Sequence, residues 1–154
     1  MQLKSGRFGT IEVEDGKALS FPKGLLGFPE EQSFILLRPQ AGSPVRWLQS
    51  VRSPALSFPV VSVESLMVDQ AYVDAALVSA GHKADAVQSS GVMVVLTAPA
   101  GGNPATVNLL APIVVNADTR TGAQVIIEGT PYTTKEPFVL RAASIPAKAA
   151  TTSP

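Results

Sequence analysis

The chain has 154 residues, twelve basic and twelve acidic side chains, and no cysteine. This length predicts one domain with an independent core. The lack of cysteine excludes a disulfide, a thiolate zinc site and a thiol nucleophile. The N-terminal residues contain no apolar signal-peptide segment. Together these features favour a cytoplasmic protein.

The charges are unevenly distributed along the chain. Residues 1–63 carry seven basic and five acidic side chains, whereas residues 64–136 carry three basic and seven acidic ones. The sequence has no cluster of lysine and arginine, so the electrostatic signature of a nucleic-acid-binding protein is missing. The acidic second half could steer a basic partner toward the protein, or it could simply be a solvated surface.

Short apolar or alternating stretches, each bounded by turn residues, predict about eight to ten strands. They lie at residues 10–13, 18–21, 33–38, 45–51, 56–63, 92–97, 105–107, 109–115 and 123–128. Their regular spacing predicts a mainly β domain, an antiparallel barrel or sandwich, with one or two short helices.

Two prolines constrain these strands. Proline cannot donate a ladder hydrogen bond, so Pro59 predicts an edge or bulged strand at residues 56–63. For the same reason Pro112 requires that the strand at residues 109–115 bend or lie on an edge.

Residues 64–88 are the least strand-like part of the chain. Asp74 could cap a short helix, Ala75–Ala80, that ends at Gly81, or it could be a turn residue. From residue 141 to residue 154 the chain is mostly Ala, Ser, Thr, Pro and Lys. This composition offers too little apolar surface to bury, so we expect a disordered tail after a domain of residues 1–140.

The loop at residues 21–31 is more apolar than a solvated loop needs to be. It holds two prolines and two glycines among Leu25, Leu26 and Phe28. These three side chains either anchor the loop to the core or form an exposed binding patch.

A polar side chain also lies beside the only tryptophan. With the strand period of two, Trp47, Gln49 and Val51 share one face. Gln49 could satisfy a backbone group, the usual fate of a half-buried amide. Alternatively, Trp47 and Gln49 could line a pocket, which would make the protein a small-ligand-binding β-barrel.

Catalytic signatures are weak. His82 is the only histidine, and no nucleophile-elbow motif is present. Glu12 and Glu14 could share a strand face, but acid/base work needs two carboxylates in different environments. A hydrolase would require these side chains to converge in a cleft. We therefore expect no enzymatic activity, no cofactor and no metal.

Four stretches, in this order and spacing, resemble the FliW family of bacterial flagellar assembly factors. They are Phe21–Phe28 (FPKGLLGF), Trp47–Val51 (WLQSV), Val107–Asn116 (VNLLAPIVVN) and Gly122–Ile127 (GAQVII), the last leading to Tyr132-Thr133-Thr134. The resemblance covers about residues 1–138. It implies an antiparallel β-barrel-like fold without catalytic activity.

The resemblance also implies partners. Members of the family bind flagellin in the cytoplasm and bind CsrA, a small dimeric RNA-binding repressor of flagellin translation. Export of flagellin frees the factor, which then antagonises CsrA allosterically, away from its RNA surface. For this chain we therefore expect a monomer with flagellin and CsrA as partners, and no direct contact with nucleic acid or membrane.

Six residues are candidates for partner binding: Phe28, Trp47, Gln49, Asp69, Asn108 and Asn116. Asp69 is what remains here of an aromatic-rich family segment at residues 66–72. The two asparagines flank the apolar stretch Leu109–Val115. Asparagines at strand ends commonly cap turns, so a purely structural role is the alternative for this pair.

Overall fold

The computed structural model describes residues 1–81 and 90–141. His82 and residues 142–154 of the expected tail lie outside the described residues. The helices and strands of the described residues are, in chain order, β1 (Gln2–Ser5), β2 (Gly9–Glu12), β3 (Leu19–Ser20), β4 (Ser33–Leu37), β5 (Val45–Ser50), β6 (Ser57–Ser62), the 3₁₀ turn η1 (Val63–Ser65), α1 (Gln70–Ser79), β7 (Ser90–Thr97), β8 (Thr106–Val107), β9 (Ile113–Asn116), β10 (Thr121–Gln124) and β11 (Glu136–Pro137). No helix within these residues is long and apolar enough to span a membrane.

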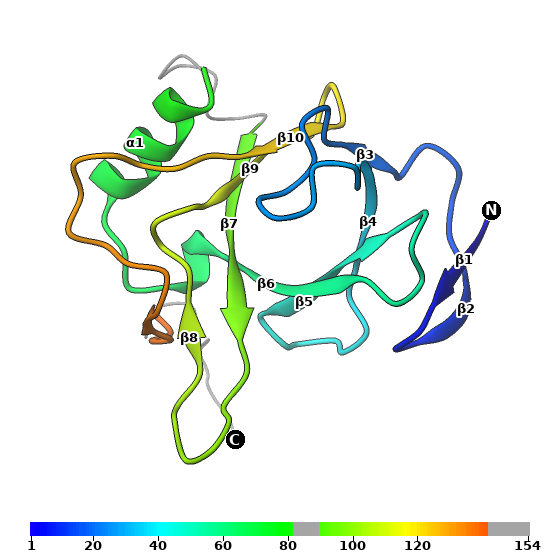
Figure 1. Ribbon diagram of the computed structural model, residues 1–154, viewed down its shortest axis with the longest axis horizontal. Helices are drawn as coiled ribbons and strands as arrows, with labels where there is room; N and C mark the ends of the chain where they lie inside the picture. Colours follow the sequence, from blue (N-terminus) through cyan, green and yellow to red (C-terminus); the bar gives the residue numbers. More distant parts are fainter. Residues whose placement is uncertain (82–89, 142–154) are drawn as a thin grey trace.

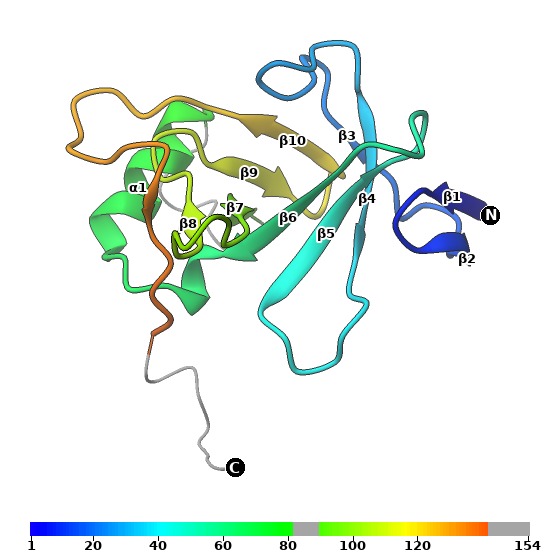
Figure 2. The same ribbon diagram turned by 60° about the horizontal axis from the view of Figure 1, so that its bottom comes forward.

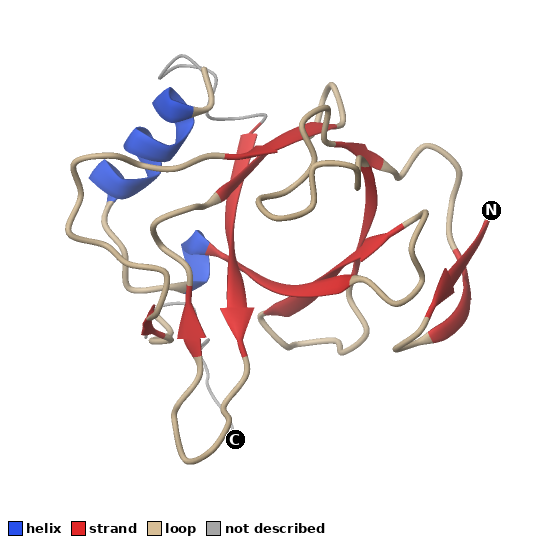
Figure 3. Ribbon diagram, viewed as in Figure 1, coloured by secondary structure: helices blue, strands red, loops and turns tan. Residues whose placement is uncertain are grey.

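Seven strands close into a barrel, which Figures 1 and 3 show end-on. Around the ring the order is β7-β6-β5-β4-β3-β10-β9, and β9 pairs back onto β7. The prediction of a mainly β, barrel-like domain is thus confirmed. One detail differs from an all-antiparallel barrel, because β3 and β10 pair in parallel, with Ser20 opposite Thr121.

Side-chain alternation gives the barrel an interior and an outer core. On β7, Met93 and Val95 pack into the interior cluster, whereas Val92 and Val94 belong to the outer cluster beneath α1. This is the period of two expected for strands that are buried on both faces. The barrel wall is therefore apolar on both sides at β6, β7 and β9.

Two elements cover the outside of the barrel. In Figures 1 and 2, α1 lies at one side of the ring and the β1–β2 hairpin at the opposite side. The helix packs Tyr72, Ala76 and Leu77 onto the outer cluster. The hairpin buries Leu3 with Ile35 of β4 in a third cluster.

The helix begins earlier than the sequence predicted. It spans Gln70–Ser79, and its cap is Asp69, whose carboxylate accepts a hydrogen bond from the Tyr72 N–H at 3.0 Å. The predicted cap, Asp74, lies inside the helix. Asp69 is the better cap because a cap residue has extended backbone, and its ψ of 169° is outside the helical range.

The proline of β6 does not place this strand at an edge. Pro59 pairs with Trp47 of β5, but the pairing with β7 starts only at Val60. The missing N–H therefore costs no ladder bond, although β6 as a whole lies between two strands. The sequence predicted an edge or bulged strand, and the edge alternative was wrong because β6 pairs with both β5 and β7.

The length of the apolar stretch 109–115 fits one or two strands, and only its second half forms one. Only Ile113–Asn116 forms β9, and Pro112 stands just before it. The carbonyl of Pro112 accepts a hydrogen bond from the Val125 N–H at 3.0 Å, which extends the pairing with β10 by one step. The proline thus marks the bend where the chain enters the barrel.

Candidate functional site

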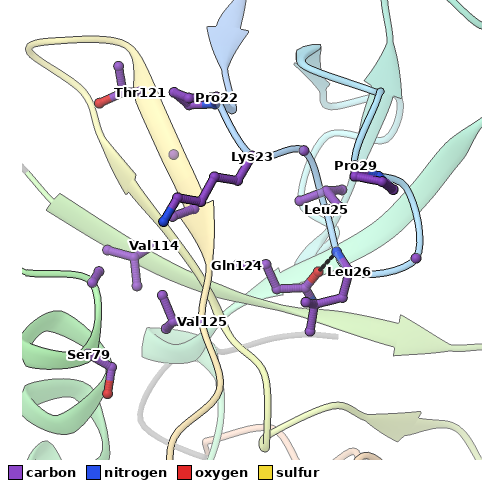
Figure 4. Close-up of a pocket in the computed structure, with 15 residues that line it drawn as sticks. Pro22, Lys23, Leu25, Leu26, Pro29, Ser79, Val114, Thr121, Gln124 and Val125 are labelled. Carbon is purple, nitrogen blue, oxygen red and sulfur yellow. Dashed lines mark hydrogen bonds between the residues drawn. The ribbon is translucent and has the colours of Figure 1, made fainter.

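An open cleft of about 690 Å³ lies over β10, between the loop of residues 22–29 and the C-terminal end of α1. We call it the β10 cleft (Figure 4). Its walls come from three of the four stretches that carry the family resemblance: residues 22–27, Val114 and residues 122–125. Segments about a hundred residues apart in the sequence therefore form one surface.

The loop wall is a tight, glycine-dependent turn. Leu25 and Phe28 exchange backbone hydrogen bonds of 3.1 and 2.8 Å. Gly24 has φ +66°, and a Cβ there would collide with the carbonyl oxygen of Phe28 and with Pro29. Only glycine fits both the left-handed conformation and this close approach.

The apolar side chains of this loop divide between the two predicted roles. Leu25 is buried in the barrel interior, so it anchors the loop. Leu26 is 49% exposed and Phe28 is 39% exposed, although the Phe28 ring packs edge-on against Phe58 at 5.4 Å. Leu26 is therefore an apolar side chain presented at the rim of the cleft.

Gln124 joins the loop to the barrel. Its Oε1 accepts a hydrogen bond from the Leu26 N–H at 2.9 Å, drawn as a dashed line in Figure 4. Its Nε2 donates to the carbonyl of Ala111 at 3.0 Å. The amide oxygen therefore connects the loop wall of the cleft to β10, while the amide nitrogen is held by the backbone beneath.

The surface of the cleft is apolar with one cation. Leu26, Val114 and Val125 line it, and the exposed side chain of Lys23 extends over it in Figure 4. Lys23 has no ion pair with any residue in the described ranges. The cleft can therefore receive an apolar segment that carries an anionic group.

Two predicted site residues of β5 have different environments. Gln49 is fully buried, and its Nε2 lies within 3.1–3.4 Å of the carbonyl oxygens of residues 50, 53, 54 and 56. It thus satisfies backbone groups, one of the two expected roles. Trp47 is half-buried between the Phe8 ring, whose centroid is 5.7 Å away, and the Arg7 guanidinium, 4.1 Å from the indole centroid.

Three other predicted site residues cap local structure. Asp69 caps α1, as described above. The Asn108 side chain accepts a hydrogen bond from the Ala111 N–H at 3.0 Å, and that of Asn116 accepts from the Asp118 and Thr119 N–H groups at 2.9 and 3.2 Å. All three use a side-chain oxygen to order a turn or a helix end, and the amide nitrogens of the two asparagines have no hydrogen-bond partner among the described residues.

None of the six predicted residues is among those that line the β10 cleft. Sequence reasoning missed Lys23, Gly122 and Gln124 as residues that build the β10 cleft. Gly122 and Gln124 belong to the Gly-x-Gln-Val stretch that carries the family resemblance. The sequence of this stretch does not indicate which loop it contacts in the fold.

The chain is similar to proteins of one known family over most of its length. The family described as FliW protein matches residues 2–138. The flagellar assembly factor FliW of Geobacter sulfurreducens is 38% identical over 143 residues, covering 93% of this chain and 89% of the relative. That of Geotalea uraniireducens is 37% identical over 139 residues, covering 90% and 84%.

A solved structure agrees with these relatives. The crystal structure of a flagellar assembly factor FliW superposes with a TM-score of 0.73 at 31% identity, over 92% of this chain and 99% of that one. The match to the family extends from β1 to the end of β11 and therefore includes the whole barrel and the β10 cleft. The chain belongs to the FliW family.

Proposed function

We propose that this protein is a flagellar assembly factor that works in the cytoplasm by binding flagellin and CsrA. In this role it couples flagellin synthesis to export: bound to flagellin it is unavailable, and when free it antagonises CsrA. This function requires no catalytic step, only reversible binding of the protein to flagellin and to CsrA. The observation that carries the proposal is that three of the four family stretches converge on the β10 cleft.

The chemistry of the cleft suits contact with a protein. The rim has an exposed apolar side chain, Leu26, and a cation, Lys23, that has no ion pair among the described residues. These are the elements of an interface with an apolar centre and a polar edge. The Gln124 bridge keeps this surface pre-organised, which lowers the entropy cost of binding. We therefore propose the β10 cleft as a partner-contacting surface.

Antagonism of CsrA without contact to RNA fits the local charge. Residues 64–136 carry seven acidic and three basic side chains. A segment with this excess of negative charge favours contact with a basic RNA-binding protein over contact with RNA. An allosteric effect on CsrA would require a coupling free energy of about 1–3 kcal/mol between the two sites.

Size-exclusion chromatography tests the function. The protein is mixed at micromolar concentration with flagellin and, separately, with CsrA from the same organism. We expect a complex with each partner, and comigration with neither would refute the proposal.

Two variants test whether a partner binds at the β10 cleft. Leu26→Glu places a charge at the cleft rim and should abolish at least one complex. Met67→Glu, at a residue that is 62% exposed and lines a different cavity, is the matched control and should abolish none. If both variants form the same complexes, the β10 cleft is not the contact surface, but the proposed binding of flagellin and CsrA is unaffected.

A further inference from the structure

A second groove, of about 780 Å³, lies between the β1–β2 hairpin and the barrel. No residue lines both this groove and the β10 cleft. Its floor includes Leu36, Met93 and Val115, whose side chains belong to or pack against the interior cluster. The groove is thus an opening through the barrel wall, and we call it the hairpin groove.

The opening exists because β3 is short. It pairs with β4 only at Phe34 and Ser33, whereas β4 continues to Leu37. The Val51 N–H donates to the Ser33 carbonyl, so odd-numbered residues of β4 direct their backbone groups toward β5. By alternation the N–H and C=O of Leu36 point into the opening. An extended chain placed there could pair with this free strand edge.

Three cations line the groove. Lys17, Arg38 and Arg120 come from different segments, which explains why the sequence showed no basic cluster. None of them forms an ion pair within the described ranges. Of the two glutamates that also line the groove, Glu12 lies 3.1 Å from the ammonium group of Met1, which offsets its charge.

A neighbouring arginine adds to the positive potential. Arg46 lines a small cavity that shares Leu36 and Met93 with the hairpin groove. Burial and the nearby Arg38 lower the pKa of Arg46, and Glu64 offsets this only in part. Two arginines therefore repel each other near the groove, an arrangement that an anionic ligand would relieve.

The backbone of Arg120 is the most informative feature. Among the described residues it is the only one other than glycine with a positive φ, +57°. A side chain with a Cβ is strained in this conformation, and glycine would avoid the cost. Arg120 ends the turn between β9 and β10, and its carbonyl accepts a hydrogen bond from the Ser20 N–H at 2.8 Å. The turn therefore fixes the position from which the Arg120 side chain reaches the groove.

We propose that the hairpin groove binds an extended, acidic segment of a partner protein, in which apolar side chains alternate with aspartate or glutamate. The apolar residues would rest on the floor at Leu36 and Met93. The carboxylates would meet Arg38 and Arg120, and the backbone would pair with the open edge of β4. This surface is separate from the β10 cleft, so the inference goes beyond the proposed function.

Selection from a random 16-residue peptide library displayed on phage tests the inference. The full-length protein is the bait, and the enriched peptides are synthesised with a fluorescent label for affinity measurement. We expect peptides that alternate Asp or Glu with Leu, Ile, Phe or Met. Arg38→Gln and Arg120→Gln should each weaken binding about tenfold, the loss typical of one charge-assisted contact. Lys135→Gln, an exposed lysine that lines neither groove, is the control and should change nothing.

A second variant separates function from stability. Arg120→Gly should weaken the same peptides while raising the melting temperature by about 2 °C, because strain is relieved. The inference is overturned if no acidic peptide is enriched, or if the enriched peptides bind the Arg38 and Arg120 variants as tightly as the wild type.

Discussion

The ring of Phe21 lies directly against Gly122. A Cβ on Gly122 would be 2.5 Å from Cε2 and 2.7 Å from Cζ of this ring. Phe21 is fully buried and packs edge-on against Phe34 at 5.5 Å, so the ring has no space to retreat. Because Gly122 has no Cβ, the β10 wall of the cleft packs directly against the Phe21 ring in the barrel interior.

Gly122→Ala should therefore destabilise the protein by about 1–3 kcal/mol, the usual cost of overpacking a core. Urea unfolding followed by circular dichroism measures this. Gly91→Ala is the matched control, because a Cβ at this sheet position meets no described residue within 4 Å and Gly91 has no positive φ. Equal effects of the two substitutions would contradict the steric explanation.

Gln124→Met should remove both hydrogen bonds of the bridge while keeping a similar volume. We expect a loss of about 1–2 kcal/mol in unfolding free energy, because the Ala111 carbonyl and the Leu26 N–H lose their partner. The Leu26 amide should also exchange with solvent faster. Gln124→Glu keeps the acceptor for Leu26, so it should preserve more of the Leu26 protection than Gln124→Met. The explanation fails if Leu26 exchange is the same in all three proteins.

Tyr72→Phe should cost about 1 kcal/mol at neutral pH, because the Tyr72 hydroxyl donates to the Leu109 carbonyl at 2.8 Å. Burial, and to a smaller extent Tyr132, raises the pKa of Tyr72 above its ordinary value of 10. The folded state therefore holds this proton more tightly than the unfolded state, and the associated stability is lost as pH rises above 10. The difference between wild type and variant should shrink there. If the difference in unfolding free energy between wild type and Tyr72→Phe stays constant to pH 11, the proposed link to the Tyr72 proton is wrong.

Glu31 should control part of the acid limb of stability. The hydroxyls of Ser50 and Ser53 each donate to its carboxylate at 2.6 Å and lower its pKa from the ordinary 4.5. The stability it contributes is therefore present above pH 4.5 and lost as pH falls through the lowered pKa. Glu31→Gln should flatten the profile in this range, whereas Glu30→Gln, a neighbouring exposed carboxylate, should leave it unchanged.

Salt should weaken the complex with CsrA. At 0.5 M ionic strength screening acts over only ~4 Å, so attraction between the acidic surface and a basic partner is largely removed. Titration of CsrA at 0.05 M and 0.5 M salt measures the change in affinity. An affinity that does not depend on salt would contradict the acidic-surface proposal.

The errors of the sequence analysis have physical causes. Asp69 and Asp74 both precede helical sequence, and local propensity does not distinguish them. The hydrogen bond from Tyr72 to Leu109 and the burial of Ala76 favour the longer helix. The hydrogen bond joins residues 37 positions apart, so no local pattern contains it.

By itself the sequence determined the strand-rich class and the positions of most strands, because alternation of apolar residues and turn residues acts over a few neighbours. The family was indicated separately, by four stretches that resemble FliW proteins. Only the tertiary structure decided the parallel closure of β3 onto β10 and the meeting of Lys23 with Gln124 in one cleft. It also decided that Lys17, Arg38 and Arg120 share a groove. Each of these depends on which strand pairs with which, and that choice is made by packing across the whole barrel rather than by local preference.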